Sequence, residues 1–160
     1  MNFYQTVGYL FFGTRLKRLS EFYISDVNKI YKKHKISFDA SWFPVFYILS
    51  KEGEVSIRRI SNELYISHSA ASQMVSSLQE KGYVKSKVSK EDARHKVVTF
   101  TAKGEKLKEK VQPVWDALQV AMEEIASEQA ATKKLLQSLS SFENSLMKEG
   151  LYERVEKTMK

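Results

Sequence analysis

Two short amphipathic stretches separated by a tight break constrain this chain more than any other feature. Apolar side chains recur at spacings of three and four from Ile57 to Leu64, which predicts a first helix. The pattern breaks at residues 65–67, and the hydroxyl of Ser67 can accept a hydrogen bond from a free backbone N–H of a following helix. That second helix has its own apolar stripe and ends at Gly82, a residue suited to the turn after a helix. The spacing therefore predicts a helix-turn-helix.

The second predicted helix has an unusual polar face, on which no acid occurs before Glu80. Its side chains are short or able to form hydrogen bonds, and they are Ser67, His68, Ser69, Ser72, Gln73, Ser76 and Ser77. Short side chains let a helix enter the major groove of DNA, and the amide of Gln73 could pair with adenine. Taken alone, this face fits a solvated, serine-rich surface equally well, and His68 fits either a DNA contact or an exposed helix start.

A basic β-hairpin is predicted directly after this helix. Residues 83–88 alternate between apolar and basic side chains, and residues 95–100 are rich in β-branched residues. Beside a helix-turn-helix, such a hairpin is typical of a wing, whose Arg94 would enter a minor groove with Asp92 as its orienter. The alternative is a surface hairpin with an ordinary ion pair, which contributes little. The lysines expected to hold phosphates are Lys85, Lys87, Lys90, Lys96 and Lys103.

Positive charge is concentrated on these segments. The whole chain of 160 residues carries a formal charge of +7. Residues 56–110 hold 12 Lys and Arg against 6 Asp and Glu, whereas residues 111–160 hold 6 against 8. A basic patch confined to one part of a chain is typical of a protein that binds a polyanion. Double-stranded DNA is the expected partner, because no strongly basic amphipathic helix favours a membrane surface.

The composition excludes several other classes of protein. There are no cysteines, so disulfides and thiolate metal sites are absent. The three histidines (His34, His68 and His95) each lack a second ligand at metal-binding spacing, and no catalytic motif is found. We therefore expect no enzyme activity, no catalytic residue, no metal and no cofactor. The longest apolar run, residues 7–13, is too short to span a membrane and no signal peptide is evident, so a cytoplasmic protein is expected.

At these residues the chain resembles the MarR (multiple antibiotic resistance regulator) family of winged-helix transcription factors. The resemblance rests on residues 60–67, Val75, Leu78, Gly82 and Val84, on the wing motif Asp92-Ala93-Arg94, and on Thr101-Ala102-Lys103-Gly104. Phe100 departs conservatively from the leucine that usually precedes the last motif. The resemblance covers about residues 3–148. It implies a mainly α fold with a small β-hairpin wing (α+β) and a homodimeric, ligand-responsive repressor that binds a pseudo-palindromic DNA site.

The resemblance also implies an organisation for the flanking helices. Residues 1–35 and 127–150 would be dimerisation helices, residues 39–126 the winged core with its long connecting helix, and residues 151–160 a loose tail or a further short helix.

Residues 3–33 read as one long helix with too many apolar groups for a single stripe, so a partner subunit or a wide internal core must cover it. Ser41 is the expected N-cap of a helix that carries Pro44 in its first turn. Ser127 is the expected N-cap of the last helix.

A small-molecule effector pocket is a further implication of the resemblance. Aromatic residues of the first two helices and of the long helix could line it, namely Tyr23, Tyr31, Trp42, Phe46 and Trp115. Aromatic residues at helical spacing also form ordinary cores, so both interpretations stay open.

Two other functions remain possible from the sequence. The winged helix could bind a protein instead of DNA, in which case the polar helix face and Arg94 would be dispensable for any nucleic-acid affinity. The aromatic stretch at residues 42–46 and the charged tail resemble MarR-like domains fused to an acetyltransferase, so the chain could be a stand-alone relative or a fragment of such a fusion. The operator sequence, the effector and the sign of regulation do not follow from these residues.

Overall fold

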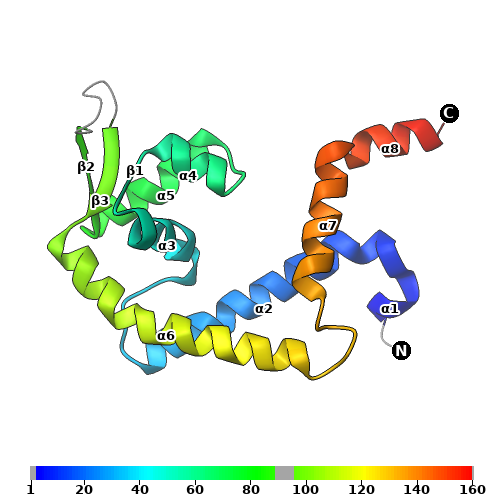
Figure 1. Cartoon of the computed structure of the whole chain (residues 1–160), viewed down its shortest axis with the longest axis horizontal. Coiled ribbons are helices and arrows are strands. Elements are labelled where there is room, and N and C mark those ends of the chain that lie inside the picture. The colour runs from blue at the N-terminus through cyan, green and yellow to red at the C-terminus, as the bar shows by residue number, and fades with distance from the viewer. Residues whose placement is uncertain (1–2, 89–95, 160) are drawn as a thin grey trace. The chain divides into compact units, whose positions relative to one another are not determined.

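The computed structural model describes residues 3–88 and 96–159. The chain forms two compact units, Met1–Val114 and Trp115–Lys160, each of which is described by itself. Helices dominate both units, and a small antiparallel sheet lies in the first (Figure 1). The mainly α class with a small β component is thereby confirmed.

The helix-turn-helix lies where the periodicity predicts it. Helix α4 spans Ile57–Glu63 and helix α5 spans His68–Glu80. The Ser67 hydroxyl accepts a hydrogen bond from the Ala70 N–H at 3.1 Å, which confirms it as the N-cap of α5. Gly82, at φ +74°, takes the left-handed conformation that follows a helix, as expected. The inner stripe of α5 is fully buried and consists of Ala71, Val75 and Leu78.

The sheet has three strands, one more than the sequence predicts. Strand β1 (Glu54–Val55) pairs with β3 (Lys96–Phe100), which pairs in turn with β2 (Val84–Val88), all antiparallel. The strand β1 thus begins at Glu54, directly after Gly53 at the end of α3. A strand of two residues is too short to show a period of two in the sequence, but Val55 is buried and lies opposite Val98.

The N-terminal segment is not the single helix that was expected. It consists of α1 (Phe3–Val7), the 3-10 helix η1 (Gly8–Phe11) and α2 (Phe12–Lys33). Gly8 has a φ of +68°, outside the helical region, and this conformation ends α1. Only Val27 and Tyr31 of α2 are buried, whereas Phe22 is 66% exposed. The excess of apolar residues noted in the sequence is thus left at the surface of the chain.

The next helices carry the core of the first unit. The 3-10 helix η2 (Ala40–Trp42) leads into α3 (Phe43–Glu52), with Pro44 in its first turn as expected. The expectation that Ser41 is the N-cap is wrong. The carboxylate of Asp39 accepts hydrogen bonds from the Ser41 N–H (2.8 Å) and hydroxyl (2.5 Å), because the first turn begins at Ala40 and Asp39 precedes it.

An aromatic cluster joins these elements below the helix-turn-helix. The ring of Phe46 on α3 lies 4.9 Å from those of Phe38 and Phe100, and 6.1 Å from that of Tyr83. Phe38 also meets Tyr31 of α2 edge to face at 5.0 Å. Such pairs add stability beyond the area that they bury, so this cluster fixes α2, α3 and the sheet to one another.

The junction between α5, the sheet and α6 (Ala102–Ser127) is tightly packed. The Thr101 hydroxyl donates to the Gly82 carbonyl at 2.7 Å and accepts from the Gly104 N–H at 3.1 Å, so Thr101 caps the start of α6. A Cβ placed on Gly104 would lie 2.0 Å from the Tyr83 carbonyl oxygen. Only a glycine lets α6 approach the start of β2 this closely.

The second unit ends in two helices. Helix α7 spans Leu135–Lys148, so the expected start at Ser127 is wrong, and Ser127 is the last residue of α6. The Thr132 hydroxyl donates to the carbonyls of Ala126 (2.8 Å) and Gln129 (2.9 Å), a local alternative to helical bonding that separates the two helices. The tail forms α8 (Leu151–Thr158), in agreement with the second of the two expectations for it.

Candidate nucleic-acid interface

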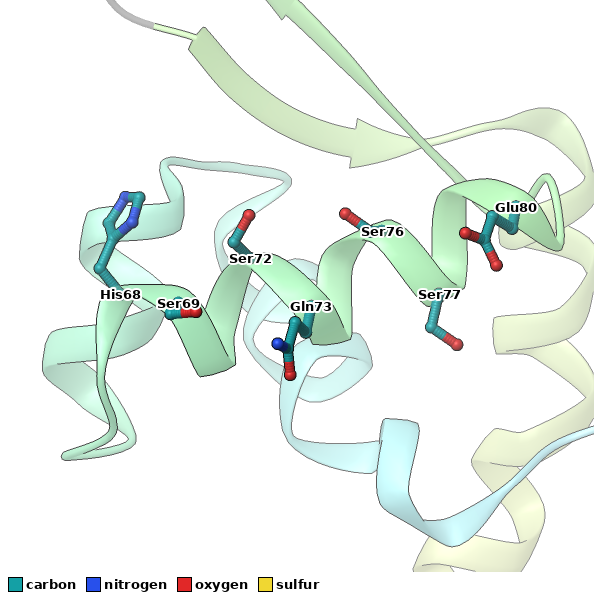
Figure 2. A pocket seen from close by; sticks show the side chains of 7 residues that line it. All are labelled: His68, Ser69, Ser72, Gln73, Ser76, Ser77 and Glu80. Carbon is teal, nitrogen blue, oxygen red and sulfur yellow. The ribbon is translucent and has the colours of Figure 1, made fainter.

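Helix α5 presents a continuous polar face at the surface of the first unit. Figure 2 shows its side chains along the helix, from His68 at the start to Glu80 at the end. They line a shallow hollow, and its members are His68, Ser69, Ser72, Gln73, Ser76, Ser77 and Glu80. Ser72 and Ser77 are half-buried and the others are exposed. The structure therefore brings together all the predicted base-reading residues except Ser67, whose hydroxyl caps the helix.

The polar groups on this face have no partner in the described part of the protein. None of the side chains from His68 to Ser77 on this face forms a hydrogen bond or ion pair with another described residue. Helical serines often bond back to a carbonyl one turn earlier, as Ser141 does to Gln137 (2.9 Å) and Ser145 to Ser141 (3.0 Å) on α7. The hydroxyls of Ser72 and Ser76 are free to bond an external partner.

The orientation of α5 relative to the hairpin is fixed by a contact that the sequence did not reveal. The side-chain amide of Gln79 donates to the Ser86 hydroxyl on β2 at 2.8 Å. Gln79 lies on the flank of α5, between the buried stripe and the outward face. Sequence periodicity places it there, but the pairing with Ser86 depends on the sheet.

The predicted wing is described only at its base. Lys85 is exposed on β2, whereas Lys87 is partly buried and forms an ion pair with Glu54 of β1. This pairing makes Lys87 less available to a phosphate than Lys85. The predicted tip residues Lys90, Asp92 and Arg94 lie outside the described residues, as does the side chain of Lys96.

The five predicted pocket residues have different environments. Tyr31 and Phe46 are 1% and 0% exposed and belong to the aromatic core. Trp42 is half-buried and lines a surface hollow with Asn28, Ile36 and Tyr83. Tyr23 is exposed on α2, and Trp115 is buried in α6. A ligand could touch Tyr31 or Phe46 only if this core opened.

Comparison with known families identifies the winged helix. Residues 37–95 match the model of the MarR family, which covers the turn before α3, the helix-turn-helix and the start of the hairpin. This part of the chain is thus similar to the winged helix of the MarR family. A search of curated protein sequences finds no match.

Solved structures of MarR proteins have the same fold as most of this chain. A MarR/EmrR family transcriptional regulator from Acinetobacter sp. ADP1 is 21% identical with a TM-score of 0.70, covering 85% of this chain and 94% of the relative. MepR of S. aureus, solved as a DNA complex, is 17% identical with a TM-score of 0.70, covering 84% and 97%. The MarR regulator of Oenococcus oeni PSU-1 is 22% identical with a TM-score of 0.66, covering 86% and 99%.

Features of a metal site or of a membrane-spanning helix are missing from the described residues. Across residues 3–88 and 96–159, no three His, Cys, Asp or Glu side chains are grouped so that they could hold a metal ion. In the same part of the chain, no helix has both the length and the apolar character needed to cross a bilayer.

Proposed function

We propose that this protein is a sequence-specific, double-stranded DNA-binding regulator of transcription. The observation that carries the proposal is the outward face of α5, where Ser69, Ser72, Gln73 and Ser76 have no partner within the described protein. A helix with short polar side chains can lie in the major groove and form hydrogen bonds to base edges. The MarR-type winged helix and the excess of positive charge in residues 56–110 support the same partner.

The roles within the interface follow from position. Gln73 lies in the middle of the face and would read a base, with Ser72 and Ser76 beside it. His68 and Ser69 begin the helix, where backbone N–H groups and the helix dipole favour a phosphate. Lys85, Lys90 and Lys96 would hold the backbone, with a smaller contribution from Lys87 because it pairs with Glu54. Arg94, oriented by Asp92, would enter the adjacent minor groove.

An enrichment experiment tests this proposal. The protein is incubated with a pool of random duplexes, and bound duplexes are recovered and amplified over several rounds. We expect convergence on a pseudo-palindrome whose half-sites lie about 10 base pairs apart, one helical turn of DNA. A pool that remains random after repeated selection would contradict sequence-specific binding and favour a winged helix that contacts a protein.

We also propose that the protein acts as a homodimer through its terminal helices. Helix α7 has a stripe of apolar residues on one face, of which Leu139 and Leu146 are each 39% exposed, and Leu16 and Leu19 are exposed on α2. Large exposed apolar surfaces of this kind are typical of interfaces between subunits. A dimer would also present two copies of α5, as a pseudo-palindromic site requires.

Charges placed on the α7 stripe are expected to dissociate this dimer. With Leu139→Asp and Leu146→Asp together, the dimer dissociation constant should rise at least about a hundredfold, because two carboxylates would be buried without partners. Sedimentation velocity measures the change. The matched control is Gln137→Asp with Asn144→Asp, which adds the same charge at exposed polar positions of α7. A double leucine variant that sediments like the control would exclude α7 from the interface.

Repression with release by a small molecule is the regulatory outcome that the family resemblance favours. An effector bound in the first unit changes DNA affinity only if it binds the free and DNA-bound forms with different affinities. Among the aromatic residues expected to line an effector pocket, Trp42 is the candidate contact with the effector, because it is half-buried and lines a surface hollow. A screen of small aromatic acids tests this part of the proposal. A change in intrinsic tryptophan fluorescence would report binding of the acid, and release of the enriched duplex would report its effect on DNA affinity.

A further inference from the structure

Six lysines gather beside the C-terminal end of α5. They line two adjoining surface hollows that share Lys35, Ile36, Ser37 and Tyr83. We call them the lysine cluster, and its members are Lys32, Lys35, Lys81, Lys103, Lys106 and Lys110. They come from the end of α2, the residues just after α5, and the first turns of α6.

Unlike several other lysines, those of the lysine cluster have no acidic partners in the described part of the chain. Lys17, Lys29, Lys87, Lys108 and Lys157 all pair with a carboxylate. None of the six cluster lysines forms an ion pair with a carboxylate in the described part of the chain. Asp39 is the one carboxylate that lines either hollow, and it is engaged by Ser41. Six unpaired like charges produce a strong positive potential at this place.

Buried aromatic residues pack beneath these lysines. Tyr83 and Phe38 are buried, and the Tyr83 hydroxyl donates to the Ser37 carbonyl at 3.3 Å. The Lys103 ammonium donates to the Lys81 carbonyl at 2.7 Å and lies 4.7 Å from the centre of the Tyr83 ring. Lys103 thus ties α6 to the end of α5, so the cluster keeps a fixed position relative to the polar face of α5.

The candidate DNA surface on α5 and the lysine cluster meet at consecutive residues of the chain. Ser77 and Glu80 line the hollow on α5, and Lys81, the next residue, lines the hollow of the cluster that also contains Lys32. Figure 2 shows Ser77 and Glu80 together at this end of the helix. A duplex lying along the α5 face would therefore bring its backbone toward the cluster.

The distribution of the lysines favours an extended polyanion over a small ion. Lys106 and Lys110 line one hollow, Lys32 and Lys81 line the other, and only Lys35 belongs to both. Successive phosphates along a strand could contact the lysines of both hollows. We infer that the lysine cluster binds backbone phosphates of the same DNA duplex, outside the segment read by α5 and outside the wing. This inference rests on the proposed function.

The test is the salt dependence of duplex binding by a variant of three cluster lysines. Lys35→Gln, Lys106→Gln and Lys110→Gln are combined, and Lys103 is left in place because it ties α6 to the end of α5. Lys35 has a φ of +56°, and an unbranched glutamine suits that conformation as lysine does. The control combines Lys133→Gln, Lys134→Gln and Lys148→Gln, three exposed lysines of the second unit. Both sets remove three charges.

We expect the cluster variant to bind the enriched and a scrambled duplex more weakly by a similar factor. The slope of log affinity against log salt should become shallower by about 0.9 for each phosphate that the variant no longer neutralises, up to about 2.7, because fewer counter-ions are released. The preference for the enriched duplex should survive, since phosphate contacts carry no sequence information. The control variant should keep the slope of the parent.

Three outcomes would overturn the inference. If the cluster variant and the control have the same slope, these lysines do not touch phosphates, while the proposed function stands because the parent still prefers the enriched duplex. If the variant loses that preference with its slope unchanged, the lysines act by positioning α5. If the parent binds no duplex at all, both the inference and the proposed function fail.

Discussion

Replacing Gly104 with alanine is expected to lower the stability of the first unit by about 3 kcal/mol. The added methyl group would lie 2.0 Å from the Tyr83 carbonyl oxygen and 2.9 Å from the Phe100 ring, and neither the backbone nor the buried ring can yield easily. Overpacking of a well-packed site costs about 1–3 kcal/mol and occasionally more, and contact with backbone places this site at the upper end. Urea unfolding followed by circular dichroism measures the loss.

The matched control for this prediction is Gly13→Ala on α2. Gly13 is helical, exposed and has no atom within 4 Å of an added Cβ. Alanine there should leave stability unchanged or raise it by up to about 1 kcal/mol, because alanine is the better helix former. If Gly104→Ala unfolds at the same urea concentration as Gly13→Ala, then α6 does not approach β2 as closely as described.

A carboxylate in the middle of the α5 face should abolish DNA binding without unfolding the protein. Ser76 is exposed and has no partner among the described residues, so Ser76→Glu is tolerated by the fold. In a complex, the longer acidic side chain would meet the bases and phosphates of the major groove, and like charges in contact cost several kcal/mol. Duplex affinity should fall at least about a hundredfold.

Anisotropy titration with the enriched duplex measures this effect, and thermal unfolding verifies the fold. Ser138→Glu on α7 introduces the same charge at an exposed serine of the second unit and should bind like the parent. Unchanged affinity of Ser76→Glu would mean that another surface of the protein contacts DNA.

The sequence predicted the local backbone correctly wherever a single residue determines its conformation. Ser67 caps α5, and Gly82 follows it in the left-handed conformation, both as expected. The signals failed where a tertiary contact or a competing side chain decides. Strand β1 exists only because β3 is beside it, and Thr132 diverts the chain between α6 and α7.

The residues of the candidate site also divide into those that a local pattern predicts and those that only tertiary packing brings together. The polar face of α5 follows from helical periodicity, so its members could be predicted from one segment. The lysine cluster could not, because Lys35, Lys81 and Lys106 come from separate elements and meet only through the packing of Tyr83 and Ser37. The pairing of Lys87 with Glu54 likewise depends on the unforeseen strand β1.

The most direct test of the central claim is the DNA sequence preference of Gln73→Ala. Fluorescence anisotropy gives the affinities for the enriched and a scrambled duplex at one fixed salt concentration, with Gln137→Ala on α7 as the control. The parent and control should prefer the enriched duplex about a thousandfold. Gln73→Ala should reduce this preference by about tenfold or more, as expected when one side chain no longer reads its base pair. Equal binding of both duplexes by the parent, or an unchanged preference in Gln73→Ala, would contradict base reading by this face of α5.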